Sequence, residues 1–159
     1  MKRNILLILL SVLVIIFDQI SKFAILKHFQ YGERVNIIPD FFDLTLVFNP
    51  GAAFSFLSNQ NGWQKYFFLI LAVVVSFYLI YAVFKKHFGL LGSIGAMMTV
   101  GGAIGNVIDR LIHGQVVDFL LFYLGNHYYP AFNIADSFIC IGAGLILMEG
   151  FRKKKYADN

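Results

Sequence analysis

The sequence predicts an all-α polytopic membrane protein with four transmembrane helices. Hydrophobic residues make up 58% of the 159 residues and charged residues only 14%, a far more apolar composition than soluble globular domains have. Four apolar stretches approach the roughly 20 residues that a helix needs to cross the hydrocarbon core. These stretches are residues 5–26, 66–84, 90–112 and 131–148. The chain has no room for a separate soluble domain, so we expect a single membrane-embedded domain, residues 1–159.

The distribution of basic residues predicts the orientation of this bundle. Eight of the thirteen lysines and arginines fall before the first stretch, between the second and third, or after the fourth: Lys2, Arg3, Lys85, Lys86 and Arg152 to Lys155. With four spans, all eight lie on one side, and the excess of positive charge in cytoplasmic loops places both termini in the cytoplasm. No basic surface interleaved with aromatic residues is evident, so nucleic acid is not an expected partner.

Two segments remain for the extracytoplasmic side, residues 28–65 and 114–130. In the first, "DLTLVF" (43–48) combines β-branched and aromatic residues with partial alternation, which is typical of a strand. Pro50 and Gly51 then indicate a turn. We therefore expect a small extracytoplasmic β element between spans one and two. The second segment carries Asp118 and an aromatic run suited to the membrane interface.

Acidic residues gather at one level of the predicted bundle. Asp136 lies near the start of the fourth span, about 7–8 Å from its outer end at 1.5 Å per residue. Asp118 lies just beyond the outer end of the third span, and Asp18 lies in the outer half of the first, one turn from Lys22. An ionisable residue inside a membrane span is costly unless it is paired or hydrated, and it indicates a functional site by default.

Each polar residue also has a purely structural interpretation. Asp18 and Lys22 can form an intrahelical ion pair, Asn133 can cap a helix, and Asp118 can be a solvated loop acid. An interhelical hydrogen-bond cluster would account for the polar residues of the third span: Asn106, Asp109 and Arg110. A small proton-coupled transporter would also use membrane carboxylates, although it favours an acid near the midplane. The residues taken singly leave these alternatives open.

Metal and disulfide chemistry find little support in the sequence. The single cysteine, Cys140, lies in an apolar run, and the four histidines include no HExxH motif. Neither a disulfide framework nor a cysteine-based zinc site can be built from this set. We therefore expect no metal and no cofactor.

Five short motifs follow one another along the chain. They are "DQISK" (18–22), "FNPGAAFSF" (48–56), "GGAIGNVIDR" (101–110), "VVDF" (116–119) and "FNIADS" (132–137). Their order on a four-span frame resembles the lipoprotein signal peptidases (signal peptidase II), bacterial aspartyl endopeptidases that remove signal peptides from prolipoproteins. The resemblance covers nearly the whole chain, and no motif position departs from it.

The resemblance implies a role for each candidate residue. Asp118 and Asp136 would be the catalytic pair of this hydrolase, activating water without a metal. Asn133 would orient Asp136. Groups that hold the substrate backbone or support the site would be the remaining motif residues: Asn49, Gly51, Asn106, Asp109, Arg110, Asp18 and Lys22.

The resemblance also implies a substrate and a location. The substrate would be a prolipoprotein whose cysteine carries a diacylglyceryl group, cut just before that cysteine. The enzyme would be a multi-pass protein of the bacterial cytoplasmic (inner) membrane, in contact with membrane lipid, with its active site at the extracytoplasmic face. We expect it to act as a monomer.

Overall fold

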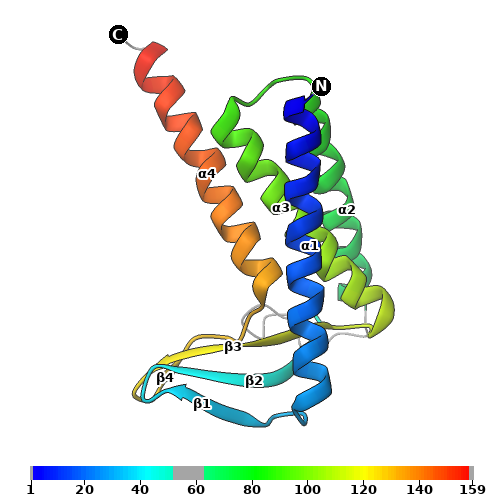
Figure 1. Ribbon diagram of the computed structural model, residues 1–159, viewed down its shortest axis with the longest axis vertical. Helices are drawn as coiled ribbons and strands as arrows, with labels where there is room; N and C mark the ends of the chain where they lie inside the picture. Colours follow the sequence, from blue (N-terminus) through cyan, green and yellow to red (C-terminus); the bar gives the residue numbers. More distant parts are fainter. Residues whose placement is uncertain (1, 52–62, 158–159) are drawn as a thin grey trace.

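The computed structural model describes residues 2–51 and 63–157. Within them lie four helices that are long and apolar enough to cross a membrane, as the sequence predicts: α1 (Lys2–His28), α2 (Trp63–Phe84), α3 (Leu90–Ile112) and α4 (Ile134–Ala157). Residues 52–62 of the predicted extracytoplasmic segment 28–65 lie outside the described residues. They include the "AAFSF" part of the second motif. The start of α1 and the end of α4 lie at the end of the bundle opposite the β-sheet (Figure 1).

The third helix is the centre of the bundle. α3 contacts α1, α2 and α4, and it is the most buried of the four helices. Small residues permit this close approach. A Cβ atom at Gly102 would overlap the backbone oxygen of Ala135 on α4, and one at Gly105 would overlap the carboxylate of Asp18 on α1. Glycine at these positions therefore brings three helix backbones together where the polar residues lie.

A four-stranded antiparallel sheet covers one end of the bundle (Figure 1). Its strands are, in spatial order, β1 (Arg34–Ile38), β2 (Phe42–Asn49), β3 (Val116–Leu124) and β4 (His127–Tyr128). The predicted β element between spans one and two is confirmed by β1 and β2. It is larger than predicted, because segment 114–130 contributes β3 and β4. β3 begins with four consecutive buried residues, so it lacks the alternation that identifies a half-exposed strand.

The start of α4 differs from the predicted span. The helix begins at Ile134, whereas the apolar stretch begins at Ala131. The intervening residues are extended because Phe132 exchanges backbone hydrogen bonds with Leu120 of β3. Asp136 is therefore the third residue of α4, in its first turn, and lies nearer the end of the helix than the hydropathy pattern predicts.

The opposite end of the bundle is fixed by a buried acid. The carboxylate of Glu149 on α4 accepts hydrogen bonds from the backbone N–H groups of Gly89 (2.6 Å) and Gly92 (2.8 Å). Gly89 immediately precedes α3 and Gly92 lies in its first turn, where N–H groups lack partners within the helix. The negative charge also complements the helix dipole. Glu149 thereby ties α4 to α3 at the end far from the sheet.

Candidate active site

The first turn of α4 fixes the position of Asp136. Asn133 precedes the helix, and its Oδ1 accepts a hydrogen bond from the Asp136 backbone N–H (2.9 Å). In return, the Asn133 backbone N–H donates to Oδ2 of Asp136 (3.3 Å). Such a reciprocal arrangement satisfies two N–H groups at a helix start. Asn133 is thus a helix cap, and the cap orients the Asp136 carboxylate.

Asp118 lies on β3 with its carboxylate between two amides. Oδ1 accepts a hydrogen bond from Nδ2 of Asn133 (2.7 Å), and Oδ2 accepts one from Nδ2 of Asn49 (3.0 Å). The Oδ1 atom of Asn49 accepts from the N–H of Gly51 (2.9 Å), which has a positive φ of 107° that favours glycine. Asp118 is only 2% exposed and is not a solvated loop acid. Asn133 contacts both aspartates and so couples β3 to α4.

Burial changes the proton affinity of Asp118. Loss of hydration raises the pKa of this carboxyl to about 7, and the charge of Asp136 acts in the same direction. Hydrogen bonds from Asn49 and Asn133 oppose the shift. The two aspartates therefore interact electrostatically, and the proton on one depends on the charge of the other.

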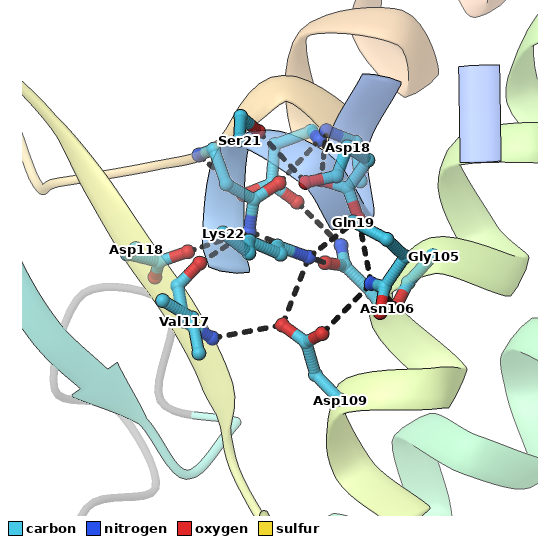
Figure 2. Close-up of polar contacts among 12 residues, drawn as sticks. Asp18, Gln19, Ser21, Lys22, Gly105, Asn106, Asp109, Val117 and Asp118 are labelled. Carbon is cyan, nitrogen blue, oxygen red and sulfur yellow. Dashed lines mark hydrogen bonds and ion pairs between the residues drawn. The ribbon is translucent and has the colours of Figure 1, made fainter. Parts of the chain in front are cut away.

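A buried lysine lies beside the aspartates. The Lys22 ammonium contacts Oδ2 of Asp18 (2.8 Å), Oδ2 of Asp109 (2.9 Å) and Oδ1 of Asn106 (3.0 Å). Figure 2 shows these groups converging from α1 and α3. Lys22 is 2% exposed and Asp18 is fully buried. The predicted intrahelical pair is therefore present, but it belongs to a larger network with a second acid from another helix.

This network holds the backbone next to each aspartate of the pair. Oδ1 of Asp18 accepts a hydrogen bond from the N–H of Ala135 (2.9 Å), immediately before Asp136. Oδ2 of Asp109 accepts one from the N–H of Val117 (3.0 Å), immediately before Asp118 (Figure 2). Lys22 thus joins two carboxylates that each anchor one element of the candidate site.

Asn106 connects the network directly to the aspartates. Its Nδ2 donates to Oδ1 of Asp136 (2.8 Å), and its Oδ1 accepts from both Lys22 (3.0 Å) and Nδ2 of Asn133 (3.2 Å).

Gln19, which the sequence analysis missed, donates to Oδ1 of Asp109 (3.0 Å) and to the backbone oxygen of Gly105 (3.2 Å). An uncharged amide within an apolar span, next to Asp18, is the signal that could have identified it.

Arg110 lies at the edge of this cluster. Its guanidinium lies over the ring of Phe68 (5.5 Å to the centroid), and Nη1 donates to the backbone oxygen of Asn106 at 3.3 Å. Its Nε is buried and has no hydrogen-bond partner among the described residues. A buried donor without a partner is costly, and Arg110 is also one of the residues that line the cavity described next.

A cavity of about 690 Å³ adjoins the cluster, within the range of small-molecule sites. Its polar wall includes Asn106, Arg110 and Asp136, while α2 and α4 contribute apolar side chains such as Leu71 and Ile139. Asn49 also lines the cavity and, as described above, binds the buried Asp118. All ten candidate residues therefore lie in or next to one connected set of contacts.

No group of three or more metal-binding side chains is found in the part of the chain that the structure describes. The two buried acids of α1 and α3, Asp18 and Asp109, are bridged by the Lys22 ammonium instead.

Fold and site together define an integral membrane protein with two coupled aspartates at one end of a helical bundle, one of which, Asp136, lines a cavity. The family model for Signal peptidase (SPase) II matches residues 10–152. The chain therefore belongs to the signal peptidase II family, as its motifs predict, and is a peptidase.

Two relatives illustrate the match in sequence. The chain is 65% identical to the lipoprotein signal peptidase of Neisseria gonorrhoeae over 146 residues, which cover 92% of this chain and 89% of the relative. It is 52% identical to that of Chromobacterium violaceum over 145 residues, 91% of this chain and 90% of the relative.

Two solved structures match the fold. Both are described as bacterial membrane enzymes studied by the in meso method, at 2.3 Å and 1.9 Å resolution. The first has a TM-score of 0.82 and 35% identity and covers 93% of this chain and 88% of its own. The second has a TM-score of 0.78 and 36% identity and covers 89% and 90%.

Proposed function

We propose that the protein is an aspartyl endopeptidase that removes signal peptides from diacylglyceryl-modified prolipoproteins, cutting just before the lipidated cysteine. The observation that carries this proposal is the coupling of Asp118 and Asp136 through Asn133, beside a cavity with one polar and one apolar wall. Family membership supports the same activity. The transporter alternative is not retained, because the acids lie at one end of the bundle and the family is a peptidase family.

In the proposed reaction, the two aspartates share one proton. Two close carboxyl groups do not both ionise easily, so one stays protonated while the other is charged. The charged carboxylate takes a proton from water as the water oxygen attacks the scissile carbonyl. The protonated carboxyl donates to the developing oxyanion. When the C–N bond breaks, a proton passes to the leaving amine, so the products are a carboxylate and the amine of the cysteine. No covalent enzyme intermediate forms.

The neighbouring polar residues position the substrate in this proposal. The guanidinium of Arg110, which lines the cavity, donates to a substrate carbonyl. Asn49 and Asn106 line the cavity and also bind the aspartates. They therefore align the peptide backbone with the pair. Asp18, Lys22 and Asp109 hold the surrounding backbone in place.

The proposed orientation places the sheet and the aspartates at the outer face of the cytoplasmic membrane. The N-terminus and the connection through Lys85 and Lys86 lie at the opposite end of the bundle (Figure 1), which supports a cytoplasmic location for both termini. The acyl chains of the substrate anchor its cysteine at the membrane surface, since each buried CH₂ contributes about 0.8 kcal/mol.

The lipid requirement tests the proposed function. We expect a prolipoprotein with its diacylglyceryl group to be cleaved at least about 100-fold faster than the same protein without it, because anchoring confines the scissile bond to the layer that contains the pair. The measurement is a gel-shift cleavage assay in which both forms share the same detergent micelles, so that delivery is equal. Equal rates would contradict lipid recognition, and no cleavage of the modified form would contradict the function.

The shifted pKa of Asp118 gives a pH prediction. Because this pKa is raised from the ordinary value of 3.8 to about 7, a pair that needs one proton loses it as pH rises through about 7. We therefore expect kcat/KM, which reports on the free enzyme, to fall about tenfold per pH unit above that value. The test is a profile between pH 6 and 9, with activity recovered on return to pH 6. A flat profile over this range would contradict the shared proton.

A further inference from the structure

A second cavity, of about 360 Å³, lies on the sheet. We call it the sheet trough and define it by residues of β1, β2, β3 and the segment after β3: Arg34, Thr45, Val47, Leu121, Tyr128 and residues 129–131. β1 and β4 are the outer strands of the sheet. Nevertheless, the guanidinium of Arg34 on β1 lies over the ring of Tyr128 on β4, 5.1 Å from its centroid. The sheet is therefore curled enough for its two edges to approach each other across the trough.

The trough adjoins the cavity of the candidate active site. Tyr129, Pro130 and Ala131 line both cavities. Val47 lines the trough and is paired with Asp118 in the register of β2 and β3. A chain that leaves the aspartate pair in the direction of the sheet therefore passes next to the trough.

The trough carries a positive charge, that of Arg34, which no acid of residues 2–51 and 63–157 pairs with. Arg34 is exposed and forms no ion pair among the described residues. The adjacent acid, Glu33, binds the backbone N–H of Gln30 (2.7 Å). Asp43 on β2 accepts hydrogen bonds from the side chains of Asn36 (2.8 Å) and Tyr123 (3.1 Å). The guanidinium therefore retains donors for an incoming carboxylate, and a carboxylate is the partner that this planar group binds best.

We infer that the trough is a specificity subsite for the mature part of the substrate, in which Arg34 favours an acidic side chain shortly after the scissile bond. This inference rests on the proposed function and names the substrate feature that the sheet recognises. The apolar signal peptide suits the apolar walls of α2 and α4. The segment that follows the bond is the part that extends toward the sheet, so it is the occupant that the adjacency of the two cavities favours.

The register of the sheet locates the position that is recognised. Tyr123, which is paired with Tyr128, lies five positions after Asp118 on β3, and a strand rises about 3.3 Å per residue. The Arg34–Tyr128 contact therefore lies roughly 16 Å along β3 from the aspartate. An extended substrate covers this distance in about five residues, and the long side chain of arginine shortens it. We expect the effect at the third to fifth mature residue, counting the lipidated cysteine as the first.

The test compares diacylglyceryl-modified prolipoproteins that differ only in having Asp or Lys at mature positions three, four or five. For each protein we take the ratio of kcat/KM for the Asp form to that for the Lys form, in the same micelles at low salt. This internal ratio does not depend on the amount of folded enzyme. At an exposed site we expect the wild-type ratio to be about 3 to 10, chiefly through KM, and to shrink with added salt.

Three variants complete the experiment. Arg34→Gln removes the charge and is expected to bring the ratio close to one, while Arg34→Glu is expected to reverse the preference. Lys27→Glu is the matched control. Lys27 is an exposed basic residue in the last turn of α1, and it lines neither cavity. It should keep the wild-type ratio.

The outcomes separate this inference from the proposed function. A wild-type ratio of one at all three positions, or an unchanged ratio in Arg34→Glu, would overturn the subsite while leaving the peptidase intact. An equal change in Lys27→Glu would also overturn it, because the effect would then come from overall charge. If wild-type enzyme cut none of the modified substrates, the proposed function itself would fail, and the subsite with it.

Discussion

Asp118→Asn and Asp136→Asn are each expected to reduce kcat by about 10³-fold or more. An amide keeps the size of the carboxyl and can still accept hydrogen bonds from Asn133. However, it can neither take a proton from water nor supply one to the oxyanion, and these transfers contribute roughly 10²–10⁴-fold each. The measurement is turnover of modified prolipoprotein by purified variants, with size-exclusion profiles and thermal unfolding to verify that both fold.

Asp40→Asn is the matched control for this substitution. Asp40 is an exposed acid in the turn between β1 and β2, with a positive φ of 59° that asparagine also tolerates. The turnover of Asp40→Asn should stay within about twofold of wild type. More than a tenth of wild-type turnover in either variant of the pair would remove that residue from the proposed mechanism.

Lys22→Met is expected to destabilise the folded protein by about 3–5 kcal/mol. Methionine fills a similar space, but it leaves Asp18 and Asp109 buried without their cation, and breaking a buried ion pair from one side carries a cost of this size. Activity should fall as well, because these two carboxylates hold the backbone N–H groups of Ala135 and Val117 beside the aspartate pair. Unfolding in a graded denaturant series, in one detergent, measures the first effect.

A control and a partial rescue make this test specific. Lys27→Met changes an exposed lysine five residues further along α1 and should alter stability by less than about 0.5 kcal/mol. Adding Asp109→Asn to Lys22→Met removes one uncompensated charge and should recover part of the loss, since residues of one network do not act additively. Equal stability of Lys22→Met and wild type would contradict the network.

The helices could be predicted from the sequence because a helix that crosses the membrane core needs about 20 apolar residues, and stretches of about this length are visible in the sequence. The predicted span 90–112 coincides with α3. The start of α4 could not be predicted in this way, because Ala131 and Phe132 are apolar yet extended: Phe132 pairs with Leu120 of β3. That contact pairs the segment before α4 with β3, and hydropathy carries no information about such pairing.

The residues that form the site could be predicted more completely than the contacts between them. The spacing of Asp18 and Lys22 predicts their pairing, because residues four apart share a helix face. The contact of Lys22 with Asp109 depends on how α1 packs on α3, and the contact of Asn133 with Asp118 depends on the position of β3 beside α4. Such contacts arise only from tertiary packing. β3 itself was missed because a strand that is buried on both faces shows no alternation.

The central claim is that Asp118 and Asp136 act as one catalytic unit. The most direct measurement is the turnover number of four proteins on one modified prolipoprotein in identical micelles: wild type, Asp118→Asn, Asp136→Asn and the double variant. If the pair shares one proton, either substitution removes the whole mechanism, so the double variant should be no slower than the single variants within about threefold. If instead the losses multiply, so that the double variant is slower by the product of the two single effects, the aspartates act independently and the shared-proton mechanism is wrong.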